Sequence, residues 1–386
     1  MNLENRKTYI VNACRFVLAL VFIFSGFVKA IDPTGTFYKI QDYFFAFHID
    51  RWFADYLLMG ISMLLSIFEF TIGIYLLFGI RRNLASLLAL LFMIVMTPLT
   101  LYLAIDNPVT NCGCFGDAVI LTNWETFIKN ILLLAAAVVV FKERELIIRL
   151  ITPRTAWMAS TYTLLYAFAL SVYCLYYLPI LDFRPYKTGT DIRRGMEQFD
   201  PLYQDFYLTN PQTGEEMTDS VLNDTVYTFL LVAHRVEKAD DSNIDLINEL
   251  YDYCVDHHYR FYALTASSEE EVEQWRDKTG AEYPFLQSDD IALKTIIRSN
   301  PGLLLLKDGI VLNKWSHNSL PDEYALTDRL DKLPLSQLHT GENLRAVAYA
   351  FAWFLIPLLL VLGIDRITPL FQRKKKKDSP NKQEQK

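Results

Sequence analysis

Two cysteines separated by one glycine, Cys112 and Cys114, are the residues of this sequence whose types and spacing best suit chemistry. Glycine tolerates the backbone angles that so small a disulfide ring demands. A disulfide in such a ring is strained, and strained, exposed disulfides are easily reduced and tend to be catalytic or regulatory. We therefore predict that the pair cycles between dithiol and disulfide; the sequence does not decide which thiol attacks a partner.

Two other interpretations of the pair remain open. The disulfide could be an inert staple of its loop, or each cysteine could be a lone thiol. A metal site needs more ligands than this loop offers. The adjacent His257 and His258 point about 100° apart on a helix, so we interpret them as surface residues and predict no metal site. The three remaining cysteines are scattered singly: Cys14, Cys174 and Cys254.

Glu69 is the clearest charge inside an apolar stretch of the sequence. It lies about 20 Å from the outer end of its stretch at the helical rise of 1.5 Å per residue. An ionisable side chain at such a depth is a functional candidate. We expect Glu69 either to relay protons or to form a buried structural hydrogen bond with a neighbouring helix.

Six apolar stretches of the 386-residue chain must position these residues. A bilayer core takes roughly 20 helical residues to cross, and each stretch is long enough or nearly so. The first and fourth are short, so we expect polar residues near their ends to reach toward the interface, namely Arg15, Lys29, Lys129 and Asn130. The stretches are Phe16–Ile31, Tyr56–Ile80, Leu84–Ile105, Phe127–Phe141, Ala156–Leu181 and Ala346–Ile364.

Basic residues in the short connections predict the orientation. Lysine and arginine clusters precede the first stretch, join the second to the third and the fourth to the fifth, and follow the sixth, whereas Asp106–Asn123 has none. All of these clusters fall on one side, which must be cytoplasmic. We predict a multi-pass protein of the cytoplasmic (inner) membrane with both termini inside. The Cys112–Cys114 loop and the whole of Asp182–Glu342 are then extracytoplasmic.

The segment Asp182–Glu342 is strongly acidic. It holds 15 Lys/Arg and 30 Asp/Glu, a net charge of −15, while the rest of the chain has a net charge of +8. A domain with this charge repels phosphate backbones, so we exclude nucleic acid as a partner. The partners that we expect are the lipid bilayer and an extracytoplasmic client protein.

The same acidic segment alternates strands with amphipathic helices. Ser267 and Ser268 cap a helix with acids in its first turn, and Lys307-Asp308-Gly309 is a hairpin turn. Strands alternating with helices and ending in a hairpin predict a three-layer α/β domain. The expected strands are Val226–Ala233, Arg260–Thr265, Tyr283–Leu286, Gly302–Leu306 and Ile310–Trp315, and the expected helices are Asn243–His257, Glu269–Thr279, Ile291–Arg298 and Asp322–Leu333.

This element order, with Asn300-Pro301 directly before the hairpin, resembles the thioredoxin fold over about 200–333. The resemblance implies a cis-proline at Pro301 beside the family's active site. The family's Cys-X-X-Cys follows the first long strand, but here that stretch, Ala233–Asp240, contains no thiol. Cys254 lies in the following helix and is expected in the core. We therefore predict a degenerate domain that exchanges no disulfides by itself and holds an extended partner against Pro301.

The membrane half carries Phe24-Ser25-Gly26-Phe27-Val28-Lys29-Ala30, then Asp32-Pro33, Glu69, Arg81-Arg82 and Cys112-Gly113-Cys114-Phe115-Gly116. Over about 12–141 these residues resemble the DoxX/MauE family of four-helix membrane proteins, and the methylamine-utilisation (MauE) branch in particular. The resemblance implies support of disulfide formation in a periplasmic dehydrogenase subunit. Related DoxX proteins are linked to quinone-coupled sulfur redox, so a membrane quinone is the candidate cofactor. Methylamine as a substrate is not implied.

Four parts follow from these observations: a DoxX/MauE-like four-helix transmembrane domain at 1–145, a fifth transmembrane helix within 146–181, a thioredoxin-like domain without Cys-X-X-Cys at 182–342, and a sixth helix with a basic tail at 343–386. The first functional hypothesis is a membrane thiol–disulfide oxidoreductase that acts on extracytoplasmic proteins through Cys112 and Cys114. The second is a non-enzymatic, membrane-anchored binding or assembly factor that uses the degenerate domain.

Overall fold

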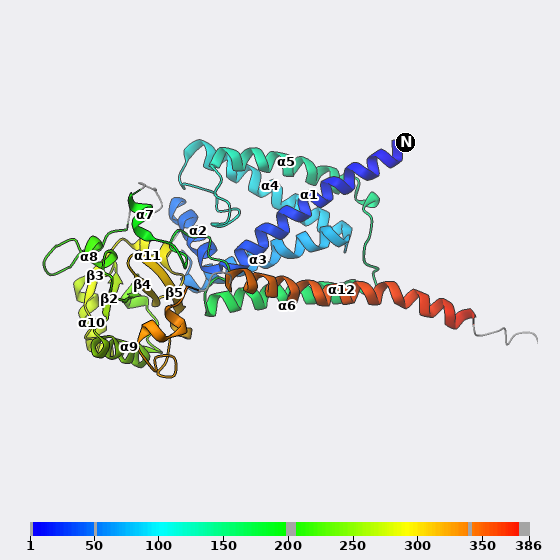
Figure 1. Cartoon of the computed structure of the whole chain (residues 1–386). Coiled ribbons are helices and arrows are strands. Elements are labelled where there is room, and N and C mark those ends of the chain that lie inside the picture. Colours follow the sequence, from blue (N-terminus) through cyan, green and yellow to red (C-terminus); the bar gives the residue numbers. More distant parts are fainter. Residues whose placement is uncertain (1–2, 50–51, 198–205, 339–341, 378–386) are drawn as a thin grey trace, which may run out of the picture. The chain divides into compact units, whose positions relative to one another are not determined.

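A computed structural model describes residues 3–49, 52–197, 206–338 and 342–377 of the chain. It divides into two compact units, one formed by Met1–Val172 with Ala346–Lys386 and the other by Tyr173–Arg345. Within the described ranges six helices are long and apolar enough to cross a membrane, which confirms the predicted number of spans. They are α1 (Leu3–Ile31), α3 (Asp55–Phe78), α4 (Arg82–Asp106), α5 (Asn123–Lys142), α6 (Ala156–Tyr176) and α12 (Glu342–Lys377) (Figure 1).

The helices α1 and α3 pack closely because glycines remove the side chains between them. A Cβ atom at Gly26 would lie 2.3 Å from the backbone nitrogen of Phe70, and one at Gly73 would lie 2.6 Å from that of Ile23. Small residues allow such backbone approach in membrane helix pairs. The contact at Gly26 places its neighbours on α1 opposite Glu69, the residue before Phe70 on α3.

A short helix, α2 (Pro33–Ala46), follows α1 after a break at Asp32. The Asp32 side chain accepts a 2.8 Å hydrogen bond from the backbone nitrogen of Gly35, and a proline in the first turn costs no helical hydrogen bond. Ser62 on α3 donates a 2.7 Å hydrogen bond to the backbone oxygen of Pro33. The first half of α3 therefore packs on α2, while its second half, with Glu69, packs on α1.

A proline inside α4 and a capping box at the start of α5 shape these two helices. Pro98 lies inside α4, where it cannot donate a helical hydrogen bond, and the Thr97 hydroxyl donates to the backbone oxygen of Met93 at 2.7 Å. The helix α5 begins with a capping box in which the Thr122 and Glu125 side chains and backbone nitrogens bond reciprocally. This cap starts α5 four residues earlier than the apolar stretch Phe127–Phe141 suggested.

The second unit is built on a five-stranded mixed sheet. Its strands are β1 (Thr228–Val232), β2 (Arg260–Thr265), β3 (Phe285–Gln287), β4 (Gly302–Lys307) and β5 (Ile310–Ser316), in the spatial order β3-β2-β1-β4-β5. The first three strands are parallel, and β4 and β5 are antiparallel to their neighbours. The helices are α7 (Ile192–Glu197), α8 (Thr218–Leu222), α9 (Ile244–His257), α10 (Glu269–Thr279) and α11 (Asp290–Ile296).

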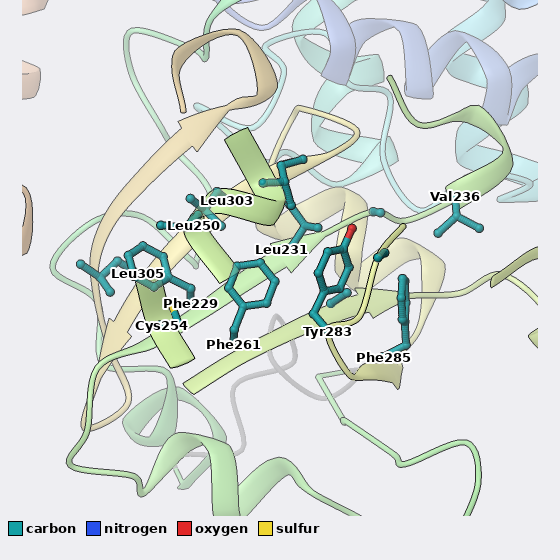
Figure 2. Close-up of a cluster of buried hydrophobic side chains, with 14 of the residues drawn as sticks. Phe229, Leu231, Val236, Leu250, Cys254, Phe261, Tyr283, Phe285, Leu303 and Leu305 are labelled. Carbon is teal, nitrogen blue, oxygen red and sulfur yellow. The ribbon is translucent and has the colours of Figure 1, made fainter. Parts of the chain in front are cut away.

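Both faces of this sheet are covered, as a three-layer domain requires. Along β1, Phe229 and Leu231 belong to one buried cluster, whereas Leu230 and Val232 belong to the cluster on the opposite face. Figure 2 shows the first cluster, in which side chains of the sheet and of α9 lie together. Cys254 is one of them and is 1% exposed, so its predicted place in the core is confirmed.

The predicted helix Asp322–Leu333 is wrong. The segment forms turns, and the 3₁₀ turn Leu330–Lys332 is its helical part. The Asp322 and Asp328 side chains accept hydrogen bonds from nearby backbone nitrogens, which competes with helix formation. Leu330 and Leu333 still enter the core, so the apolar spacing had correctly indicated burial but not the backbone conformation.

Candidate redox site in the membrane unit

The two cysteines of the α4–α5 connection form a disulfide with a Cα–Cα distance of 5.4 Å. Gly113 between them has a φ of +64°, and a Cβ atom there would lie 3.0 Å from Cγ of Lys39 on α2. Only glycine adopts this conformation at no steric cost. The predicted closure of the ring through glycine is therefore confirmed, while its redox activity stays a prediction.

Hydrogen bonds fold the connection back into the helix bundle, toward α2 (Figure 1). The Asn123 amide at the start of α5 donates to the Asn107 side chain at 2.8 Å and to the backbone oxygen of Val109 at 2.9 Å. The Tyr43 hydroxyl on α2 donates to the backbone oxygen of Cys112 at 2.7 Å. Burial and the neighbouring Asp42 raise the pKa of Tyr43, so this hydroxyl remains a donor across the physiological range.

A buried ion pair lies directly beneath the disulfide. Lys29 Nζ on α1 lies 2.7 Å from Glu69 Oε2 and 3.0 Å from Oε1 on α3, and both residues are buried. Ser25, one turn before Lys29, donates to Glu69 Oε2 at 2.6 Å and accepts from Lys29 Nζ at 2.7 Å. The expected buried hydrogen bond between Glu69 and a neighbouring helix is therefore confirmed, and its role as a proton relay stays a prediction.

This cluster also holds the loop. The backbone oxygen of Cys114 lies 2.9 Å from Lys29 Nζ and 2.7 Å from Ser25 Oγ. Two buried side chains of α1 therefore hold the backbone at one cysteine of the disulfide. Backbone outside a helix is tolerated at this depth because protein groups satisfy its hydrogen-bonding atoms.

The expectation that polar residues of the first and fourth stretches reach toward the interface is wrong for Lys29 and Asn130, which bond to neighbouring helices. Lys29 is held by Glu69, and Arg15 is 1% exposed and donates to the backbone oxygen of Ile148 at 2.5 Å. Asn130 is buried and donates to the Thr100 hydroxyl at 3.1 Å. Lys129 is half-buried, with Nζ 4.1 Å from the centre of the Phe115 ring.

A pocket opens between α1, α3, α4 and α5 at this point. Its apolar walls include Phe22, Phe92, Met93 and Met96, and its polar groups come from Ser25, Lys29, Glu69, Lys129 and Asn130. Cys114 and Phe115 complete the lining from the loop. Ser25, Lys29 and Lys129 were not predicted as site residues from the sequence. The spacing of four between Ser25 and Lys29, which puts both on one face of α1, was the signal that pointed to them.

The two sulfur-bearing residues have different surroundings. Cys112 is 6% exposed and packs in a small cluster with Leu103 and Val109. Cys114 is half-buried and packs against the same cluster, and it also lines the inner pocket and a second, shallow one on the loop. The disulfide therefore has a buried end and an accessible end.

In the second unit, the region around Pro301 matches the thioredoxin pattern without its thiols. The Asn300–Pro301 peptide bond is cis, as that resemblance implied. The backbone oxygen of Asn300 accepts a 2.9 Å hydrogen bond from the Asp240 nitrogen, and the Asn300 side chain donates to the backbone oxygen of Arg235 at 2.9 Å. Pro301 itself is buried. The stretch that replaces Cys-X-X-Cys is thus tied to the proline loop.

Comparison with known proteins links the membrane unit to a family. Residues 7–142 match the family model described as "Methylamine utilisation protein MauE". A search of curated proteins found no match.

Among solved structures, the chain is similar to the C-terminal domain of a protein described as a thiol-disulfide oxidoreductase from Bacteroides thetaiotaomicron. The identity is 16% over 28% of this chain and 80% of that one, with a TM-score of 0.25. It is also similar to an uncharacterized conserved protein from Geobacillus kaustophilus, at 15% identity over 44% of this chain and 82% of that one, with a TM-score of 0.24. These scores are too low to carry an argument about function.

The matched range spans α1 to α5. It contains every lining residue of the pocket between α1, α3, α4 and α5, called the disulfide pocket below. The strand order and the cis-proline give the second unit a thioredoxin-like fold. Residues 7–142 therefore match the MauE family model, and the chain adds two further membrane-spanning helices and a thioredoxin-like α/β domain that lacks the Cys-X-X-Cys pair of thioredoxins.

Proposed function

We propose that this chain is a membrane thiol–disulfide redox protein that acts on extracytoplasmic partner proteins through Cys112 and Cys114. The observation that carries the proposal is the buried Lys29–Glu69 pair beneath the disulfide, bonded to the backbone oxygen of Cys114. Ionisable residues are costly inside membrane helices and mark functional sites. An inert staple of a loop needs no such pair.

The orientation is part of this proposal. With both termini cytoplasmic, the disulfide and residues 182–342 face the extracytoplasmic side, where disulfides persist. The distribution of lysine and arginine over the short connections supports this orientation. The thioredoxin-like domain then lies on the side of the membrane where client proteins are, and we assign it the role of presenting them.

The chemistry is thiol–disulfide exchange. A dithiol client that becomes oxidised passes two electrons to the Cys112–Cys114 disulfide, which opens to two thiols, and the reverse reaction reduces a client disulfide. A membrane quinone is the candidate carrier for these electrons. Phe22 and Met93 of the pocket lining offer apolar contacts, and Lys129 offers a hydrogen-bond donor. Glu69 is the candidate to accept or supply a proton there.

A second function, a non-enzymatic binding or assembly factor, is favoured by the second unit alone. The stretch Ala233–Asp240 holds no thiol, and burial raises the pKa of the Cys254 thiol far above its ordinary value, which makes it inert. A partner would bind near Pro301. Because the Pro301 ring is buried, contacts there would come from the exposed residues around it.

The two functions are separated by replacing the thiols in the full-length chain. The variants are Cys112→Ser, Cys114→Ser and the double substitution, with Cys254→Ser as the matched control. Redox activity predicts that a single variant accumulates a mixed disulfide with a client and that the double variant loses function, while the control keeps it. A double variant that fully complements a deletion strain would favour the binding factor.

A further inference from the structure

The disulfide pocket carries more positive than negative charge. Of the groups that line it, Lys29 is neutralised by Glu69 at 2.7 Å. Lys129 forms no ion pair with any residue that the structure describes, and its ammonium lies over the Phe115 ring. The pocket lining therefore has a net charge of +1. The unpaired charge, on Lys129, lies against Phe115, the residue that follows Cys114.

An uncompensated ammonium in a membrane pocket is costly to bury, so its position needs a reason. While the disulfide is closed, the carboxylate of the pocket lining, Glu69, is already paired with Lys29. Opening the disulfide creates one, because thiol–disulfide exchange passes through thiolates. A neighbouring lysine lowers a thiol's pKa and raises its thiolate fraction. The Lys129 ammonium is thus placed to stabilise the reduced form of the cysteine pair.

The surroundings decide which sulfur benefits. Both cysteines pack against the cluster of Leu103 and Val109. Of the two, Cys114 also lines the pocket that holds Lys129. Other charged or titratable groups near the pair are Lys39, close to Gly113, and Tyr43, bonded to the backbone oxygen of Cys112. Lys39 is paired with Asp42 at 3.4 Å, and the α4 residues that line the pocket carry no charge. Asp117 follows in the same loop.

We infer that Cys114 is the sulfur that exchanges with the client, that Cys112 resolves the mixed disulfide, and that Lys129 is a positioning residue that stabilises the Cys114 thiolate. This inference deepens the proposed function and rests on it. It assigns the exchanging and the resolving role within the cysteine pair, which the sequence left undecided.

The exchange then runs as follows in the reducing direction. The Cys114 thiolate attacks one sulfur of a client disulfide, a bond forms between them, and the second client sulfur leaves as a thiolate that takes up a proton. The Cys112 thiolate then attacks Cys114 Sγ, which closes the Cys112–Cys114 disulfide and releases the first client sulfur. The client gains two electrons and the pair loses two. In the oxidising direction a client thiolate attacks Cys114 Sγ and Cys112 leaves as a thiolate. The second client thiolate then attacks the bonded client sulfur, which closes the client disulfide and releases the Cys114 thiolate.

The test measures the Cys114 thiol in full-length protein reduced with dithiothreitol, in a Cys112→Ser background. The rate of alkylation by iodoacetamide is followed against pH by mass spectrometry of the peptide that contains Cys114. Lys129→Gln is expected to move the midpoint of the profile up by about one pH unit, and Lys129→Arg to restore it. Lys142→Gln, at the exposed end of α5, is the control and should leave it unchanged.

A profile that is the same with lysine, glutamine and arginine at 129 would overturn the role of Lys129. Trapping in cells tests the order of the cysteines. The inference expects client adducts on Cys114 in Cys112→Ser and few or none on Cys112 in Cys114→Ser; the opposite result would overturn it. A pair that never forms an adduct in either variant would sink the proposed function as well, and the alkylation profile distinguishes that case.

Discussion

Lys29 Nζ on α1 donates a 2.9 Å hydrogen bond to the backbone oxygen of Cys114, so a buried charge of the first membrane helix holds the loop that carries the disulfide. The same ammonium is paired with Glu69 on α3. Three segments far apart in the sequence are therefore joined at one nitrogen atom. Changes to any of them should reach the disulfide.

Removing Glu69 should destabilise the membrane unit strongly. Glu69→Ala leaves the Lys29 ammonium buried without its counter-charge, which costs about 3–5 kcal/mol. Replacing both residues by methionine removes both charges and should recover most of that loss. The measurement is the thermal unfolding of the purified full-length protein in detergent.

The control for this prediction is the exposed pair of Lys39 and Asp42, whose Asp42 side chain is 52% exposed. Asp42→Ala should cost less than about 1 kcal/mol. If the double methionine variant were less stable than Glu69→Ala, the pair would be contributing net stability, and the account of Glu69 as a counter-charge would be wrong.

Gly26 should tolerate no side chain. A Cβ atom there would lie 2.3 Å from the backbone nitrogen of Phe70, so Gly26→Ala must push α1 away from α3. The displacement pulls Lys29 from Glu69, and we expect a loss of about 1–3 kcal/mol together with faster reduction of the disulfide by dithiothreitol. Gly60→Ala, at a position on α3 with no atom within 4 Å of the added Cβ, should behave as the parent. Equal behaviour of the two variants would argue against the close contact.

The acidic domain should lose stability in acid through Asp182. Its carboxylate lies 2.8 Å from both Lys314 Nζ and Arg184 Nε. Although burial raises the pKa of Asp182, these two cations hold it well below the ordinary value. The folded pKa lies below the unfolded one, so the stability from this group is present above about pH 4 and is lost as the pH falls toward the folded value.

Asp182→Asn should therefore lower the protection of the β5 amides against hydrogen exchange at pH 7. The expected loss in the free energy of protection is about 3–5 kcal/mol. Below about pH 4 the difference from the parent should shrink, because protonation removes the parent's charge as well. Exchange of full-length protein, analysed by mass spectrometry with both proteins at each pH, provides the comparison. Asp328→Asn, in a pair exposed to solvent, is the control. A difference that grows in acid would contradict the assigned sign.

The sequence predicted the elements whose signals are local. Ser268 caps α10 with Glu271 completing the capping box, and β2 and α10 begin and end where the patterns placed them. Each signal lies within a few residues of the element that it defines. The predicted helix after Pro321 failed because apolar spacing reports burial, while aspartate side chains decided the backbone.

The redox site could be predicted only in part. The cysteine pair and Glu69 were visible because a thiol pair and a charge inside an apolar stretch stand out alone. Lys29 was not, because a lysine near the end of a stretch has the same pattern whether it reaches the interface or pairs with another helix. That choice depends on the contact of Gly26 with Phe70, which joins positions 44 residues apart and leaves no local pattern.

The most direct test of the central claim is the redox state of Cys112 and Cys114 in intact cells. Cells are treated with a mild, membrane-impermeant reductant or left untreated, then acid-quenched, and free thiols are tagged and located by mass spectrometry. A redox-active pair predicts a mixture of dithiol and disulfide that shifts toward dithiol with the reductant and returns on its removal. A pair that stays fully oxidised under all of these conditions would contradict the claim and leave the disulfide as a staple of its loop.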